Sequence, residues 1–376
     1  MGDQEKKRKI PVCSTTMDGN EGRYLKECVD TNWVSSSGPF VKRFEAAFAQ
    51  LVKVPHAVTT SSGTGALHMA LEALELKAGD EVIVPALTMI ASGNTIRYTG
   101  ATPVIVDVNP ETGNICPSQV EAAFTPRTRA VMVVHLYGLP CDMEPLLEMC
   151  RARGVAVVED AAEAIGTTAP DGRPAGGLGD LGAFSFFANK VITAGEGGMV
   201  VCRDEELARK VRLLKDQWFV PEPRFYHPRM GFNYRMSNLQ AAVGLAQLEQ
   251  VEQLVQARIN VATRYRELLQ ELPWLELPAD FFKGGKNSHW MYAVRLTPDA
   301  PCTREFLASR MREDGIDTRD FFIPLNLQPA FNDVSRPCPV AESMGKRGLL
   351  LPTGAVLTAE DQQRVADSIR DCFAGM

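Results

Sequence analysis

Short β-prone runs alternate with helical stretches from residue 56 onward, and this alternation limits the folds open to the chain. The expected strands cover residues 56–60, 81–84, 103–108, 130–135, 155–159 and 183–186, and the expected helices cover 64–74, 91–98, 117–124 and 144–153. Several of these strands are apolar at nearly every position, which is typical of strands buried on both faces of a parallel sheet. Ligands of such sheets bind beyond the carboxyl ends of the strands. The pattern therefore predicts an α/β domain with its site at that edge.

The pattern changes near residue 240. Residues 239–272 are expected to form one long helix, followed by a strand over 290–296 and a helix over 303–314. A closing helix is expected over 359–373, with Thr358 as its N-cap. The 376 residues are enough for two domains. We therefore expect a large domain over residues 1–250 and a smaller α+β domain over residues 251–376.

Composition excludes several classes of function. The net charge of −6 provides no basic surplus, so we expect no nucleic-acid partner. No apolar run reaches the ~18 residues that a membrane span requires, so we expect no membrane partner. The nine cysteines include no pair at CxxC spacing and the five histidines lie far apart, which indicates reduced thiols and no metal site. We expect a cytoplasmic protein.

Residues 60–67 are rich in Ser, Thr and Gly, and they join an expected strand to an expected helix. Hydroxyl groups and the free N–H groups of a helix N-terminus form a site that suits phosphate. Gly63 and Thr64 are therefore candidates for phosphate binding. An ordinary capped helix start is the alternative explanation of the same pattern.

Two charged residues follow apolar strands. Asp160 comes directly after residues 155–159, where it either caps a helix or serves as a buried carboxylate for a cationic ring nitrogen. Lys190 lies among Phe186, Phe187 and Val191 and precedes a glycine-rich turn. An apolar setting lowers the pKa of a lysine, and the neutral amine can form a Schiff base. A phosphate site, a lysine and a carboxylate are what pyridoxal phosphate requires.

These segments, together with residues 33–39, 104–108, 233–238 and 321–324, resemble the DegT/DnrJ/EryC1/StrS family of nucleotide-sugar aminotransferases. The resemblance covers almost the whole chain. It implies a fold-type-I enzyme that depends on pyridoxal 5'-phosphate, with a mostly parallel seven-stranded sheet in the large domain. It also implies a homodimer with shared active sites.

The resemblance assigns roles to individual positions. Lys190 corresponds to the Schiff-base lysine, Asp160 to the partner of the ring nitrogen, and Glu163 to a contact of the ring's 3-oxygen. The remaining cofactor positions are the phosphate contacts Gly63, Thr64 and Ser185, the ring-covering Met89, where relatives usually carry an aromatic residue, and Asn233, which would reach the phosphate of the neighbouring subunit. The expected substrate contacts are Trp33, Ser35, His135, Arg235, Arg319 and Asn326. A purely structural role is equally compatible with the position of His135.

The resemblance implies transfer of an amino group from glutamate to C4 of a nucleotide-linked 4-keto-6-deoxyhexose. Three alternatives stay open at this point. The first is amination at C3 of a 3-keto sugar. The second is a dehydratase on the same fold, although relatives of that kind have His in place of the lysine. The third is a catalytically silent regulatory or binding protein, which would have little reason to keep Lys190 and Asp160 together.

Overall fold

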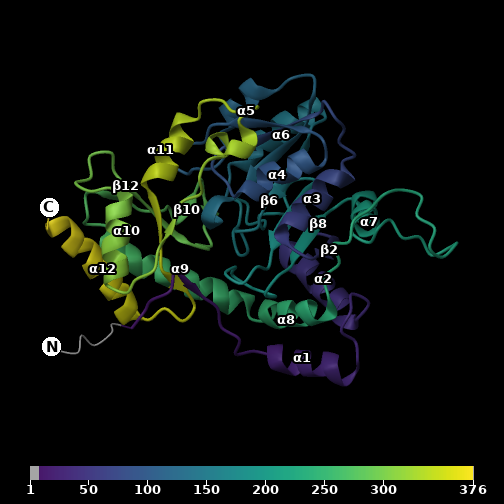
Figure 1. Ribbon diagram of the computed structural model, residues 1–376, viewed down its shortest axis with the longest axis horizontal. Coiled ribbons are helices and arrows are strands. Elements are labelled where there is room, and N and C mark those ends of the chain that lie inside the picture. Colours follow the sequence, from purple (N-terminus) through teal and green to yellow (C-terminus); the bar gives the residue numbers. More distant parts are fainter. Residues whose placement is uncertain (1–7, 376) are drawn as a thin grey trace.

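A seven-stranded sheet forms the centre of the larger part of the computed structural model, which describes residues 8–375 (Figure 1). Its strands lie in the order β2 (His56–Thr60), β8 (Gly198–Cys202), β7 (Leu181–Ser185), β6 (Ala156–Asp160), β5 (Thr128–Val134), β3 (Glu81–Pro85) and β4 (Thr102–Val106). Only β8 runs antiparallel to its neighbours in this sheet. The prediction of a mostly parallel seven-stranded sheet is confirmed.

Both faces of the sheet are covered by helices. Side chains along a strand point alternately to its two sides, so one strand can contribute apolar side chains to two cores. In β5, Met132 packs into one core while Val131 and Val133 pack into the other. The first core is completed by α2 (Pro39–Val52), α3 (Gly63–Ala73), α4 (Ile90–Tyr98), α7 (Glu205–Leu214) and α8 (Asn238–Leu248), and the second by α5 (Pro117–Ala123) and α6 (Met143–Arg153). Helix α1 (Glu21–Asp30) packs on α8.

A separate core lies beside this sheet (Figure 1). It contains a four-stranded antiparallel sheet in the order β13 (Arg319–Asp320), β14 (Gly348–Leu351), β12 (Tyr292–Leu296) and β9 (Leu275–Glu276), covered by α9 (Val251–Leu269), α10 (Arg304–Glu313) and α12 (Ala359–Ala374). The Thr358 hydroxyl accepts a hydrogen bond from Asp361 N–H, so the predicted cap of α12 is confirmed. The shorter elements are α11 (Pro339–Arg347), β10 (Phe281–Phe282), β11 (Gly285–Lys286) and the 3-10 turns Leu136–Gly138, Leu325–Leu327 and Pro329–Phe331.

The first residues of the described chain join this second core. Ile10 is buried in it, and β1 (Cys13–Ser14) pairs in parallel with β15 (Thr353–Gly354). The first and the last residues that the structure describes therefore lie on the same side of the molecule (Figure 1). The division of the chain at residue 250 stays a prediction.

The prediction of one helix over residues 239–272 is wrong. The chain forms two helices, α8 and α9, which are separated at Glu249 and Gln250. The Glu249 carboxylate accepts hydrogen bonds from Tyr24 and Asn20, which lie in and beside α1. Contacts with a distant segment thus hold the turn, and no local pattern in residues 239–272 reveals them.

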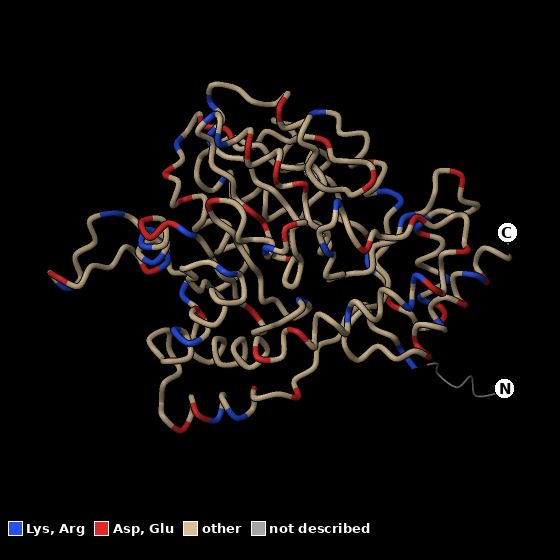
Figure 2. The backbone as a smooth tube through the Cα atoms, turned by 180° about the vertical axis from the view of Figure 1, so that it is seen from behind, with Lys and Arg blue, Asp and Glu red and all other residues tan. Residues whose placement is uncertain are grey.

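The segment between α7 and α8, residues 215–237, projects from the body of the molecule; we call it the arm (Figures 1 and 2). It exposes Phe225, Tyr226 and Met230, the last at 93% of its surface. Acidic and basic residues are interspersed along the rest of the chain in Figure 2. Within residues 8–375, no helix is long and apolar enough to cross a membrane.

Candidate active site

A cavity of ≈ 310 Å³ opens at the carboxyl edge of the large sheet. Eight of the residues singled out in the sequence line it: Gly63, Thr64, Met89, Asp160, Glu163, Ser185, Lys190 and Arg319. They come from the ends of β6 and β7, the start of α3, the start of α4 and the edge strand β13. The rule for open α/β sheets thus places the cavity correctly. The roles of these residues remain predictions.

Lys190 lies in the loop that follows β7, and its side chain is largely buried. Its Nζ atom is 3.7 Å from the centre of the Trp290 ring and 3.9 Å from Glu163 Oε1. Burial lowers the pKa of the Lys190 ammonium, and the charges of Glu163 and Asp160 oppose that shift. A lysine held in this way is poised to act as a neutral nucleophile.

Asp160 ends strand β6 and is buried. One carboxylate oxygen accepts a hydrogen bond from Ser92 Oγ at 2.7 Å, and the other accepts one from the Ala162 N–H at 3.2 Å. The Thr88 hydroxyl lies 2.8 Å from Ser92 Oγ and extends the chain of hydrogen bonds. Burial raises the pKa of the Asp160 carboxyl, so a cationic partner in the cavity is needed to favour its charged form.

Glu163 is a second buried carboxyl group in the cavity. The Tyr137 N–H donates a hydrogen bond to its Oε2 at 2.7 Å. Burial raises the pKa of Glu163 to about 7, although the charge of Lys190 and the Tyr137 hydrogen bond act in the opposite direction. Glu163 thus differs from Asp160 in having one hydrogen-bond donor instead of two.

The start of α3 and the end of β7 meet in the lining of the same cavity, at Gly63 and Ser185. A Cβ atom on Gly63 would lie 2.7 Å from Ser185 Cβ, so only glycine allows the two segments to approach this closely. Ser62 caps the helix by accepting from the Gly65 N–H. The first N–H groups of a helix have no acceptor within the helix, and here they adjoin the Ser185 hydroxyl. This arrangement suits a phosphate group.

The donors and acceptors of the cavity fit pyridoxal phosphate. The set provides a helix N-terminus for phosphate, a carboxylate for the ring nitrogen and a desolvated lysine for the aldehyde. Asn189 Oδ1, next to Lys190, is buried and has no hydrogen-bond partner among the described residues. A polar atom in that state is typical of a site that receives a ligand or water.

Met89 and Arg319 line the cavity at its exposed side. Met89 is 46% exposed, and its sulfur accepts from the Ala91 N–H at 3.1 Å, so the side chain begins α4 as its N-cap. Arg319 forms no ion pair with any residue from 8 to 375. An unpaired guanidinium at the mouth of a cavity is available for an anionic substrate group.

Six of the predicted residues do not line this cavity in the single chain: Trp33, Ser35, His135, Asn233, Arg235 and Asn326. Asn233 and Arg235 belong to the arm, where Arg235 pairs with Asp216. Asn326 is buried and donates to Glu342 Oε1 at 2.7 Å. For Asn233 this placement is compatible with the expectation that it serves the neighbouring subunit, which stays a prediction.

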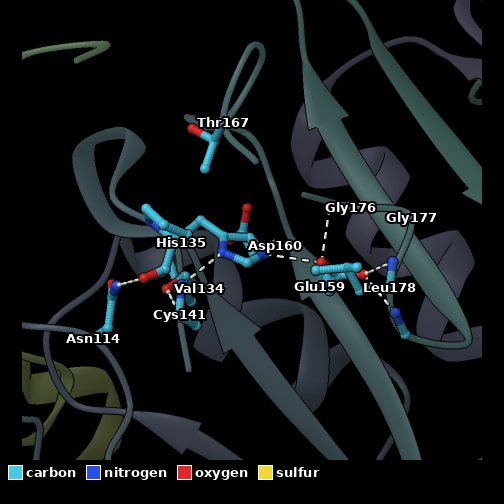
Figure 3. A network of polar contacts seen from close by, with 12 residues as sticks. Asn114, Val134, His135, Cys141, Glu159, Asp160, Thr167, Gly176, Gly177 and Leu178 are labelled. Carbon is cyan, nitrogen blue, oxygen red and sulfur yellow. Dashed lines mark hydrogen bonds and ion pairs between the residues drawn. The ribbon is translucent and has the colours of Figure 1, made fainter. Parts of the chain in front are cut away.

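The expectation that His135 contacts substrate is wrong for this chain. His135 is fully buried, and both of its ring nitrogens are engaged (Figure 3). The Cys141 N–H donates to Nδ1 at 3.1 Å, which leaves the proton on Nε2, and Nε2 donates to Glu159 Oε2 at 2.9 Å. His135 therefore joins β6 to the turn after β5 through hydrogen bonds.

Glu159 collects four hydrogen bonds at the end of β6. Besides His135, it accepts from the backbone N–H groups of Gly176, Leu178 and Gly179 at 2.6–2.7 Å (Figure 3). These bonds hold the pKa of the Glu159 carboxyl below its ordinary value in spite of its burial. The anion therefore ties the loop after β6 to the strand that carries Asp160.

Several residues at the site carry no local signal that marks them. Ser92 lies in a helix and is identified only by its hydrogen bond to Asp160. Arg258 of α9 is buried and donates to the backbone oxygens of Trp290 at 2.8 Å and Lys190 at 3.4 Å. A lone arginine in a helix gives no sequence indication of this role.

Glu159→Gln is expected to destabilise the protein by about 3 kcal/mol or more, because an amide nitrogen would face groups that also donate and would leave buried N–H groups unsatisfied. His135 cannot compensate, since its other nitrogen already accepts from Cys141. The measurement is the free energy of unfolding at fixed protein concentration. Glu267→Gln, at an exposed carboxylate in α9, is the matched control and should change it by less than about 0.5 kcal/mol. Equal stability of the two variants would contradict the assignment.

Comparisons with known proteins agree with this site. The model of the DegT/DnrJ/EryC1/StrS aminotransferase family matches residues 15–370. The chain is 46% identical to the GDP-perosamine synthase of Caulobacter vibrioides, over 95% of this chain and 96% of the relative. It is 41% identical to the GDP-perosamine synthase of Escherichia coli O157:H7, over 97% and 99%.

Among solved structures, the chain is similar to the aminotransferase TlmJ from Streptoalloteichus hindustanus. The TM-score is 0.92 and the identity 33%, with 97% of this chain and 99% of the other covered. Family match, full-length relatives, fold and cavity all agree. The protein is a pyridoxal-phosphate-dependent enzyme and belongs to the DegT/DnrJ/EryC1/StrS aminotransferase family.

Proposed function

We propose that this protein transfers an amino group from glutamate to C4 of a GDP-linked 4-keto-6-deoxyhexose, as a GDP-perosamine synthase would. The observation that carries the proposal is its similarity, over nearly the full length of both chains, to proteins of that name. The cavity supports it, since Asp160 and Glu163 line the cavity and belong to the resemblance. Amination at C3 of a different nucleotide sugar is the alternative that the experiment below separates.

The residues of the cavity divide the chemistry among them. When bound, pyridoxal phosphate supplies an aldehyde carbon and a ring that withdraws electrons from the reacting carbon. Asp160 holds a proton on the ring nitrogen, and Ser92 fixes the orientation of that carboxylate. Burial favours the neutral amine of Lys190. In that form Lys190 would relay a proton between the substrate carbon that bears the amino group and the aldehyde carbon of the cofactor.

Arg319 is the residue best placed to bind the charged part of the substrates. It lines the cavity beside Phe322 and has no ion-pair partner within the described chain. Its planar guanidinium can bind a diphosphate or a carboxylate through two parallel hydrogen bonds. We therefore assign it to an anionic group of the sugar nucleotide or of glutamate.

A panel of GDP-, dTDP- and UDP-linked 4-keto and 3-keto sugars, each with glutamate as donor, tests the substrate. The GDP-linked 4-keto-6-deoxyhexose is expected to give a kcat/KM at least ~10-fold above the others, a difference of ~1.4 kcal/mol in transition-state binding. Product mass and the position of the new amine are read by mass spectrometry and NMR. A higher kcat/KM for any 3-keto sugar would replace the proposal with its alternative.

Lys190→Ala is expected to lower kcat by ~100-fold or more, because it removes the group that moves the proton. It should also abolish covalent retention of the cofactor after borohydride reduction, measured as the mass of the denatured chain. Lys42→Ala, at an exposed lysine of α2, is the control and should retain both properties. Covalent retention in the Lys190 variant would assign the attachment to another residue.

We propose further that the protein is a homodimer with shared active sites. The arm supports this, because it exposes a cluster of large apolar side chains that a monomer would leave in water. Asn233 and Arg235 of the arm and Trp33 and Ser35 of the α1–α2 loop all lie outside the cavity of their own chain. A second copy of the chain would bring such residues to a cavity.

Complementation tests the sharing of sites. Lys190→Ala and Asn233→Ala chains are mixed under conditions in which the subunits exchange. In a two-fold dimer, about a quarter of the sites in a randomised mixture should then carry neither lesion, so activity should rise well above that of either parent. If exchange is demonstrated by mass and activity does not rise, Asn233 acts within its own chain.

A further inference from the structure

Glu163 and Lys190 form a buried ion pair, and the two carboxylate oxygens of Glu163 differ in their hydrogen bonds. Glu163 Oε2 receives the Tyr137 N–H, whereas Oε1 receives no hydrogen bond from any described residue. Lys190 Nζ lies 3.9 Å from Oε1 and is the ion-pair partner of Glu163. One side of the Glu163 carboxyl group therefore depends on Lys190 for its stability as an anion.

That dependence has a consequence for the reaction. Lys190 must be an uncharged amine in order to attack a carbonyl carbon. Once the ammonium loses its charge, two carboxyl groups, Asp160 and Glu163, remain buried in one cavity. Two neighbouring buried carboxylates cannot both ionise readily, because each raises the pKa of the other. Asp160 keeps two hydrogen-bond donors, so Glu163 is the group that takes up a proton.

We propose that Glu163 stores the proton of Lys190 and is thus a second acid–base residue of the reaction. The proton leaves Nζ of Lys190 as the amine becomes neutral and binds Oε1 of Glu163, which changes from an acceptor to a hydrogen-bond donor facing the cavity. A shift of about 1 Å closes the gap between the two atoms to hydrogen-bond distance, and one bridging water serves equally. The reverse transfer restores the ammonium. Net charge is conserved in the pair.

The groups around Glu163 support this direction of transfer. Asp160 from β6 raises its pKa, and Lys190 from the loop after β7 lowers it. Tyr137, from the turn after β5, is itself neutral because burial raises the pKa of its phenol. Arg319 from β13 lowers the pKa of Lys190 and so favours loss of the proton. With a pKa of about 7, Glu163 holds the proton below neutral pH and loses it above.

The first test is a titration of the visible absorption of the cofactor-loaded protein between about pH 5 and about pH 9. A change of charge on Glu163 within the cavity should shift the cofactor band and give a pH-dependent transition in the wild type. Glu163→Gln should show no such transition. Glu196→Gln removes another carboxylate from the lining of the same cavity and should retain it. A transition of unchanged midpoint in Glu163→Gln would overturn the proposal.

The second test does not require cofactor loading. Infrared spectra of the full chain without cofactor should contain a protonated carboxylic-acid band that disappears as the pH rises through about 7. The band should be missing from Glu163→Gln, whose folding is checked by its thermal melting curve. Identical carboxylic-acid bands in the two proteins below pH 7 would also overturn the proposal. Neither test uses a sugar nucleotide, so an error in the proposed substrate leaves both results interpretable.

Discussion

The buried anion of Glu159 is the interaction on which the geometry of the site depends. A charge inside a protein is tolerated only where hydrogen bonds replace water, and here four donors do so. Three of them are backbone N–H groups of one loop, so the loop cannot move without exposing the charge to an apolar environment. Because successive residues of a strand point to opposite sides, the same anchoring aims Asp160 into the cavity. Two neighbouring residues thus serve the fold and the site: Glu159 anchors the loop, and Asp160 lines the cavity.

The sheet and the position of the cavity could be predicted because both follow from local rules. Continuous apolar runs indicate strands buried on two faces, and a parallel arrangement brings their carboxyl ends to one edge. Lys190, Asp160 and Ser185 each follow or end such a run, and they do meet in the cavity. Helices α1 and α2 and the break between α8 and α9 could not be predicted in this way. They depend on contacts such as that of Glu249 with Tyr24, between segments far apart in the chain.

The same limit applies within the site. His135 follows an apolar strand just as Asp160 does, yet one is sealed in a structural network and the other opens to the cavity. The difference arises from the turn after β5, which directs the His135 ring toward Glu159, and from the Cys141 N–H that fixes its tautomer. Ser92 and Arg258 act through hydrogen bonds to residues of other elements. Such contacts exist only in the folded chain, so a sequence pattern cannot predict them.

The pairing of β1 with β15 has a consequence for how the chain is made. Cys13 is synthesised long before its strand partner Thr353, and the whole of the large sheet lies between them. During synthesis β1 must therefore wait until β15 has been made before it can pair. The large sheet can assemble earlier, since all of its strands precede residue 203. The smaller core can be completed only later, after the strands and helices that follow the large sheet have been made.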